Sequence, residues 1–140
     1  MIAVRPSDPN DADRLLQIWR DAVASSHGFL AIDDRVMIEQ LVAQYVSESP
    51  LLVATLDRNP VGFMGVSGIN IDSLFVDPAV QGKGIGRFLT DRVGSPATVD
   101  VNEQNELAVG FYGHLGFKVT GRSALDDQGR PYPLLHMRRG

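Results

Sequence analysis

Apolar and polar residues alternate at the start of the chain and then change to a helical period. The alternation over residues 2–5 predicts a short opening strand. Two stretches follow in which apolar residues recur every three or four positions, which predicts two consecutive helices. The first is expected to end near His27-Gly28. Asp33 or Asp34 can cap the second, which is expected to stop before Pro50.

Strand-length apolar runs separated by turn residues make up the middle of the chain. Residues 51–56 and 61–67 flank a turn of Asp, Arg, Asn and Pro, which predicts a β-hairpin. A third run, over 71–76, leads through a glycine-rich segment into a short helix in which Phe88 and Leu89 are expected to face inward. The remaining expected elements are a strand at 98–101, a helix at 105–115 closed by Gly116, and two final strands at 117–120 and 134–137.

The order of these elements determines the expected fold class. Along the chain it is β-α-α-β-β-β-α-β-α-β-β, which combines a hairpin with crossover helices. We therefore expect an α/β (α+β) fold, with a mixed central sheet of about seven strands and helices on both of its faces. A length of 140 residues suits a single domain over 1–140. The polar segment 123–133 is a functional candidate, because long loops in compact domains usually have a function.

Composition excludes several classes of protein. With 44% hydrophobic and 21% charged residues, the chain has the make-up of a soluble globular domain. It has no cysteine, which rules out thiol catalysis. A formal net charge of −4 argues against a nucleic acid as the main partner. The apolar runs are too short to span a membrane, and the first ten residues lack the apolar core of a signal peptide. We therefore predict a cytoplasmic protein, with no metal site.

The most informative segment is Gln81-Gly82-Lys83-Gly84-Ile85-Gly86, between a predicted strand and a predicted helix. Three glycines in five residues let the backbone approach a ligand closely and turn its amides toward it. The helix N-terminus adds unpaired N–H groups that suit a phosphate or pyrophosphate, and Lys83 and Arg87 add positive charge. The spacing matches neither a P-loop nor a dinucleotide-binding fingerprint. A plain glycine turn that joins a strand to a helix is the alternative.

Two motifs resemble those of the GNAT superfamily of N-acetyltransferases. Gln81, Gly84 and Gly86 form Q-x-x-G-x-G, which resembles the acetyl-CoA loop of that superfamily. Downstream, residues 105–117 resemble its N-x-x-A-x-x-F-Y-x-x-x-G-F segment. The expected element order also matches the fold of the superfamily, so the resemblance covers nearly the whole chain. More narrowly, residues 26–30, 101–105 and 130–135 resemble the bacterial YjaB-like subgroup.

The resemblance implies an enzyme that transfers the acetyl group of acetyl-CoA directly to a primary amine. The strand 71–76 would splay from 98–101, and the pantetheine arm would pair with the backbone of Phe75 and Val76. The Val76 N–H would stabilise the negative charge of the tetrahedral intermediate. Tyr112 would protonate the departing thiolate. The implied cofactor-binding residues are Phe75, Val76, Gln81, Gly82, Lys83, Gly84, Ile85, Gly86, Arg87, Asn105 and Tyr112.

Some of these residues also have ordinary structural interpretations. Tyr112 can be a core tyrosine with a satisfied hydroxyl, and Asn105 can be the cap of the helix that follows it. Trp19 and Tyr45 lie at helical core spacing and are expected in the core or in a pocket wall. The loops that contain Phe29 and Tyr132 would border the acceptor site, so both are candidate substrate contacts.

The acceptor amine, of a protein lysine or a small molecule, must lose a proton before it attacks. At pH 7 this costs a lysine-like amine roughly 4–5 kcal/mol. Candidate bases are His27, Asp72 and Glu103, and the sequence does not choose among them.

Two other functions compete with the enzyme hypothesis. One is a non-catalytic sensor or interaction module that binds acetyl-CoA. The other is an acetyltransferase that acts on aminoacyl-tRNA, which the net charge of −4 disfavours. The chain is expected to be a monomer or a homodimer.

Overall fold

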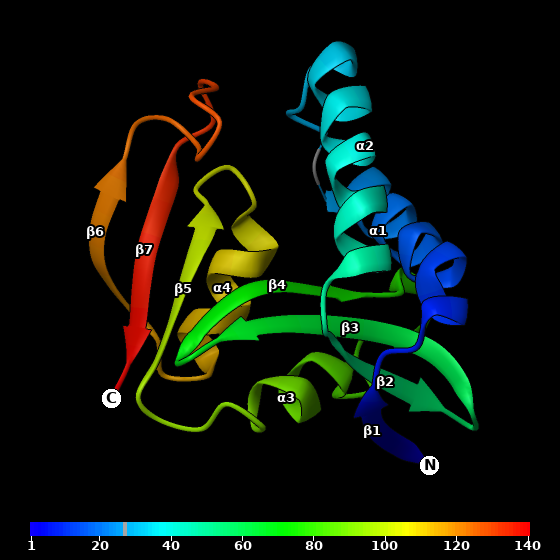
Figure 1. The fold of residues 1–140 in the computed structure, drawn as a ribbon. Coiled ribbons are helices and arrows are strands. Elements are labelled where there is room, and N and C mark those ends of the chain that lie inside the picture. Colours follow the sequence, from blue (N-terminus) through cyan, green and yellow to red (C-terminus); the bar gives the residue numbers. More distant parts are fainter. Residues whose placement is uncertain (27) are drawn as a thin grey trace. The chain divides into compact units, whose positions relative to one another are not determined.

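The computed structural model describes residues 1–26 and 28–140 (Figure 1). Its elements follow one another in the order that the sequence predicts. They are β1 (Ile2–Pro6), α1 (Ala12–Ser26), α2 (Ile32–Glu48), β2 (Leu52–Leu56), β3 (Asn59–Ser67), β4 (Asn70–Val76), α3 (Ile85–Thr90), β5 (Ala97–Asn102), α4 (Glu106–His114), β6 (Lys118–Ser123) and β7 (Leu134–Arg139), with 3-10 turns at Pro9–Asp11 and Pro78–Val80.

The strands form one mixed sheet of seven strands in the order β1-β2-β3-β4-β5-β7-β6. The β4–β5 pair is parallel and joins Asn70 to Thr98 and Ile71 to Val99. The pairs β1–β2, β2–β3, β5–β7 and β6–β7 are antiparallel. The predicted fold class, a mixed sheet that combines hairpins with crossover helices, is therefore confirmed.

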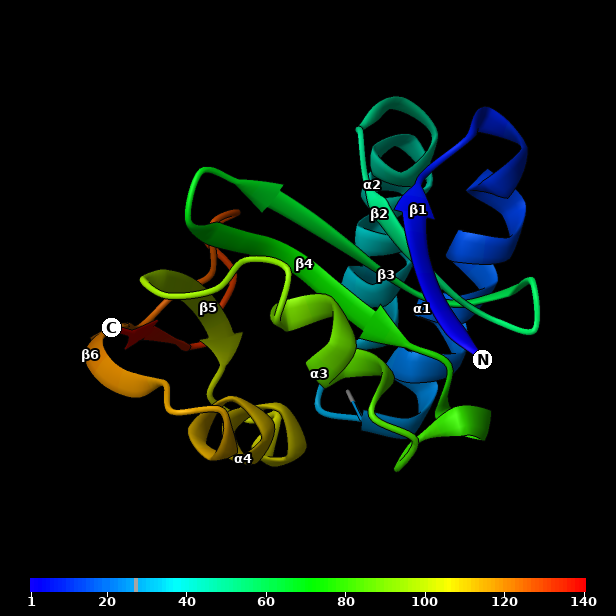
Figure 2. The ribbon, with the colours of Figure 1, turned by 90° about the horizontal axis from the view of Figure 1, so that it is seen from below.

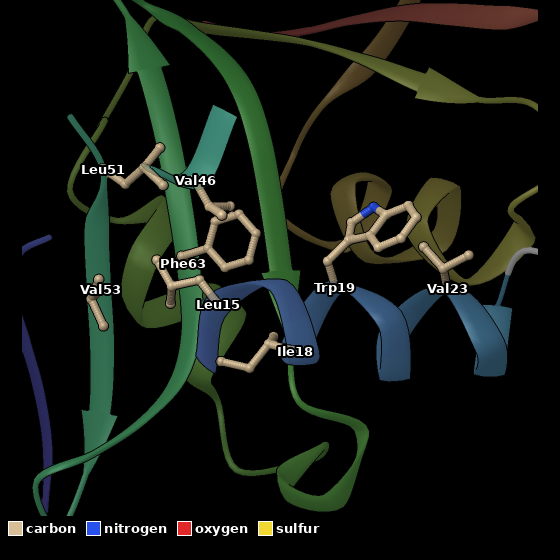
Figure 3. Packing of buried hydrophobic residues seen from close by; sticks show 8 residues of the cluster. All are labelled: Leu15, Ile18, Trp19, Val23, Val46, Leu51, Val53 and Phe63. Carbon is tan, nitrogen blue, oxygen red and sulfur yellow. The ribbon is translucent and has the colours of Figure 1, made fainter. Parts of the chain in front are cut away.

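The chain divides into two compact units, one of residues 1–65 and 73–92 and the other of residues 66–72 and 93–140. The first unit contains an apolar cluster in which α1 and α2 pack against β2 and β3 (Figure 3). Trp19, predicted for the core, is 2% exposed. That the two units belong to a single domain over 1–140 remains a prediction. The buried members of the cluster are Leu15, Ile18, Trp19, Val23, Val46, Leu51, Val53 and Phe63.

Helices cover both faces of β3 within the first unit. Phe63 points into the cluster beneath α1 and α2, so its neighbour Gly62 faces the other side of the sheet. A Cβ at Gly62 would lie 3.2 Å from Ile85 Cγ2 and 3.1 Å from the Phe75 carbonyl oxygen. Glycine at this position therefore lets α3 pack directly against β3, on the face opposite to α1 and α2. This contact holds α3 and the end of β4 close together.

In the second unit, α4 packs on one face of β5 (Figures 1 and 2). Ala97, Val99 and Val101 are buried and alternate with more exposed residues, as expected for a strand covered on one side. Arg139 at the end of β7 links this strand to the segment before β5, because its guanidinium donates to the Gly94 carbonyl at 2.6 Å. The same group lies 4.9 Å from the centre of the Phe117 ring.

Two details of the predicted helices are wrong. Helix α2 begins at Ile32 with Ala31 as its N-cap, so neither Asp33 nor Asp34 caps it. Both carboxylates lie in the first turn instead, where the helix dipole favours negative charge. In α3, Leu89 is buried as predicted but Phe88 is 39% exposed. The buried face of this short helix consists of Ile85, Gly86, Leu89 and Thr90, and the side chain of Phe88 points away from it.

Candidate functional site

The glycine-rich loop lies in the first unit, between the 3-10 turn Pro78–Val80 and α3. Gly82 and Gly84 have φ angles of +83° and +80°, which L side chains rarely adopt, and Gly84 is the N-cap of α3. A Cβ at either glycine would meet nothing within 4 Å, so the backbone is open to a ligand there. The predicted loop residues fall into an exposed set of Gln81, Gly82, Lys83, Gly84 and Arg87 and a buried pair of Ile85 and Gly86.

Asp77 fixes the start of this loop. Its carboxylate accepts hydrogen bonds from the Ala79 N–H at 3.0 Å and from Arg14 Nη2 at 2.8 Å, and its own N–H donates to the Val61 carbonyl at 2.8 Å. Arg14 Nε also donates to the Pro60 carbonyl, so α1, β3 and the loop are tied together. These hydrogen bonds, the one from Ala79 first, hold the pKa of Asp77 below its ordinary value. No local sequence pattern marks Arg14 as part of the site, because its partner Asp77 lies 63 residues further along the chain.

We expect Asp77→Asn to lower the free energy of unfolding at neutral pH by up to about 1 kcal/mol, the usual value of a partly exposed ion pair. Asn keeps an acceptor for the Ala79 N–H and removes only the charge facing Arg14. Because the folded-state pKa of Asp77 is depressed, its contribution is complete above about pH 4 and is lost as the pH falls through the folded pKa. Urea unfolding at pH 7 and pH 3 measures this. A difference between wild type and variant that is equal at both pH values contradicts the assignment.

The end of β4 runs from Ser73 to Val76, directly before the loop. The Ser73 hydroxyl accepts the Gly65 N–H at 3.0 Å and lies 2.7 Å from the Tyr45 hydroxyl. Tyr45, predicted for the core or a pocket wall, is half-buried. The Phe75 ring lies 5.6 Å from that of Phe63, and Phe75 and Val76 are both half-buried. The backbone roles expected of Phe75 and Val76 remain predictions.

In the second unit, Asn105 lies directly before α4 and Tyr112 lies within this helix. Asn105 is the N-cap of α4, and its Oδ1 accepts the Ala108 N–H at 3.1 Å, so its interpretation as a helix cap is confirmed. Tyr112 is 6% exposed, and its ring packs edge-to-face against Phe111 at 5.1 Å and Phe117 at 5.3 Å. Burial raises the pKa of its phenol well above the ordinary value, so the group stays protonated at neutral pH.

The Tyr112 hydroxyl is the polar group of this side chain. Among the described residues, the Tyr112 hydroxyl has no hydrogen-bond partner. If this oxygen were also fully buried, it would be an unsatisfied buried group, but the only such side-chain nitrogen or oxygen among these residues is Arg139 Nε. The phenol oxygen is therefore not fully buried, although the residue as a whole is only 6% exposed. A neutral phenol in this state can donate a proton to a ligand.

The candidate bases differ in the hydrogen bonds and ion pairs that their side chains already make. His27 lies outside the described residues. Asp72 accepts hydrogen bonds from Ser67 Oγ and from Asn70 Nδ2. Glu103 pairs with Arg122, whose Nε lies 2.6 Å and Nη2 3.2 Å from the two carboxylate oxygens. Arg122 lowers the pKa of Glu103, which makes that carboxylate a weaker base.

The predicted acceptor contacts are both part of irregular segments. Phe29 is half-buried in the turn before α2, and Tyr132 is 7% exposed in the segment before β7. The polar segment before Tyr132 is folded around Asp126, whose carboxylate accepts the N–H groups of Gln128 at 2.9 Å and Arg130 at 2.8 Å. Contact of Phe29 or Tyr132 with an acceptor remains a prediction.

None of the helices within residues 1–26 and 28–140 has the length and apolar character that a membrane crossing requires. The same residues contain no cluster of three or more His, Asp or Glu side chains arranged to hold a metal ion. The cytoplasmic location and the oligomeric state remain predictions.

Comparison with known proteins extends these observations. Residues 21–137 match the acetyltransferase (GNAT) domain family. The peptidyl-lysine N-acetyltransferase YjaB of Salmonella typhimurium is 48% identical over 141 residues, which cover 98% of this chain and 97% of the relative. The solution structure of apo-form YjaB from Escherichia coli has a TM-score of 0.95 at 47% identity and covers 99% of this chain and 97% of that one.

A more distant structure shows how widely the fold is shared. The structure of yncA from Salmonella typhimurium, with its cofactor acetyl-CoA, has a TM-score of 0.62 at 23% identity, and the match covers 99% of this chain and 92% of that one. At this identity the likeness shows the fold alone. The predicted resemblance to the superfamily and to its YjaB-like subgroup is confirmed by the family match and by the near-full-length relatives. The chain therefore belongs to the GNAT acetyltransferase family and is an acyltransferase by class.

Proposed function

We propose that this protein transfers the acetyl group of acetyl-CoA to the ε-amine of a lysine in a protein or peptide. The observation that carries the choice of acceptor is the 48% identity, over 98% of the chain, to a relative named as a peptidyl-lysine N-acetyltransferase. The family match supports acetyl-CoA as the donor. The chain has no cysteine, so direct attack of the amine on the thioester is favoured over an acyl-cysteine intermediate.

The glycine-rich loop is the proposed holder of the pyrophosphate. The positive φ angles of Gly82 and Gly84 and the free space above both residues support this role. Their amides and those of the neighbouring loop residues would donate to the phosphate oxygens, and exposed Lys83 and Arg87 would add positive charge. The backbone of Phe75 and Val76 would pair with the pantetheine amides, and the Val76 N–H would stabilise the oxyanion.

Tyr112 is the proposed general acid. In the reaction, the neutral amine nitrogen bonds to the thioester carbon and, positively charged by the attack, loses a proton to solvent to become the amide nitrogen. The carbon–sulfur bond breaks, and the phenol gives its proton to the leaving thiolate. Burial keeps the phenol of Tyr112 protonated at neutral pH, so the proton that this role requires is present. Solvent then restores its proton.

Two measurements with the purified protein test the proposal. Calorimetry with acetyl-CoA should give a heat of binding, and incubation with a lysine peptide blocked at its N-terminus should release free CoA thiol and add one acetyl group to the peptide by mass. A small-amine panel measured in parallel identifies a preference for another acceptor. Binding without thiol release for any amine would indicate the sensor function instead. An absence of binding at millimolar acetyl-CoA would exclude the proposed donor.

A further inference from the structure

Three polar side chains of the second unit form a continuous hydrogen-bonded chain that the proposed function has not used. Asp100 Oδ1 on β5 lies 2.6 Å from His136 Nδ1 on β7. The other ring nitrogen, Nε2 of His136, lies 2.7 Å from Ser123 Oγ at the end of β6. The two contacts engage both nitrogens of one imidazole, with a carboxylate on one side and a hydroxyl on the other.

The register of the sheet brings these residues together. Asp100 is directly opposite His136 in the β5–β7 pair, and Ser123 lies opposite Leu134, two residues before His136, in the β6–β7 pair. Val99 and Val101 are buried, so Asp100 projects from the other face of β5. Asp100 is also the first residue of β5 after Val99, the last position that pairs with β4.

The hydrogen-bonding capacity of these groups sets the direction of the chain. A carboxylate can only accept, so it holds the ring proton of His136 on Nδ1 and leaves Nε2 as an acceptor. The Ser123 hydroxyl then donates to Nε2, and its oxygen keeps lone pairs for an incoming N–H. The side chains of His136 and Asp100 are 37% and 44% exposed, so a substrate can reach them from solvent.

We propose that the Ser123–His136–Asp100 chain removes the proton from the acceptor ammonium, an inference that rests on the proposed acetyl transfer. The ammonium gives one proton to Ser123 Oγ while the Ser123 proton passes to His136 Nε2. This leaves a neutral amine and an imidazolium that Asp100 stabilises. The amine then attacks the thioester carbon, and its nitrogen loses a second proton to solvent as the amide forms. The imidazolium returns its proton to solvent through the same hydroxyl.

This chain has a proton-accepting nitrogen that the other described candidates lack. Asp72 is held by two donors and Glu103 by a bidentate arginine, so both carboxylates are already compensated. The carboxylate bonded to His136 is Asp100, and the next side chain on the same face of β7 is Arg138, opposite Lys118 of β6. These two cations lie further along the strands and are not hydrogen-bonded to the imidazole.

Replacement of His136 by Gln tests the proposal, because an amide keeps a polar group near Ser123 but cannot accept a proton at neutral pH. The exposed neighbour change Lys118→Gln is the matched control. Each protein is assayed at pH 7 with a lysine peptide and with the same peptide containing thialysine, a less basic analogue of equal length. We expect His136→Gln to lower kcat/KM for the lysine peptide about 100-fold, with a clearly smaller loss for thialysine and no change in acetyl-CoA affinity. Ser123→Ala should likewise lower kcat/KM more for the lysine peptide than for the thialysine peptide.

The two acceptors separate proton removal from a structural role. If the chain only joins three strands, His136→Gln and Ser123→Ala lower the rates for both peptides by equal factors, and the proposal is wrong. Unchanged kcat/KM for the lysine peptide in both variants also overturns it. Failure of the proposed acetyl transfer looks different, since the wild-type protein would then acetylate neither peptide.

Discussion

Replacement of Tyr112 by Phe is expected to lower kcat for acetyl transfer by about 100-fold, within the usual range for a lost general acid. The dissociation constant for acetyl-CoA should stay within about twofold, which corresponds to about 0.4 kcal/mol. The change removes only the hydroxyl. The remaining phenyl ring would keep the edge-to-face packing of Tyr112 against Phe111 and Phe117. Single-turnover thiol release and calorimetry measure the two quantities separately.

Protein stability provides the control for this variant. The Tyr112 hydroxyl has no hydrogen-bond partner among the described residues, so its removal should change the free energy of unfolding by no more than about 0.5 kcal/mol. A large drop in kcat in a protein of unchanged stability assigns the effect to chemistry. Full kcat in Tyr112→Phe would show that the phenol takes no part in the mechanism. A loss of kcat that accompanies a loss of stability would indicate that Tyr112 has a structural role in the core.

The order of elements could be predicted because each one carries its own local signal. Alternation marks β1, helical spacing marks α1 and α2, and a glycine or proline closes most elements. The wrong predictions concern residues whose position is determined by packing against a neighbouring element. Ala31 is the N-cap of α2 although two carboxylates lie in the first turn of that helix. Phe88 is exposed because Ile85 and Leu89 already fill the space above Gly62. No property of Phe88 itself distinguishes it from an inward-facing residue.

The residues of the candidate site also differ in whether a local sequence pattern can reveal them. The glycine loop and the Asn105-to-Phe117 segment are contiguous, so a motif can reveal them. Asp100, Ser123 and His136 are separated by up to 36 positions along the chain and meet only through the β5–β7 and β6–β7 registers. A one-residue shift in either pair would move one of the three side chains to the other face. The ion pair of Arg14 with Asp77 spans 63 residues and depends on the packing of α1 in the same manner.

Replacement of Gly84 by Ala is expected to weaken acetyl-CoA binding by at least about tenfold. The φ of +80° at Gly84 lies in the left-handed region. An alanine there either keeps this conformation, at a cost of about 1–2 kcal/mol, or shifts the backbone of the loop. The added methyl would also project into the open space above the loop. A tenfold loss is about 1.4 kcal/mol, comparable with one lost hydrogen bond to a charged oxygen. Calorimetry with acetyl-CoA measures it.

Gly129→Ala is the matched control, because Gly129 has a φ of +76° and equally open surroundings but lies in the segment between β6 and β7. Both variants should lose a similar free energy of unfolding, about 1–2 kcal/mol each. Only Gly84→Ala should lose affinity for acetyl-CoA. Equal affinities in the two variants would mean that the loop does not hold the pyrophosphate. Since the same strain is present in both proteins, a loss confined to Gly84→Ala arises from contact with the ligand and not from a weaker fold.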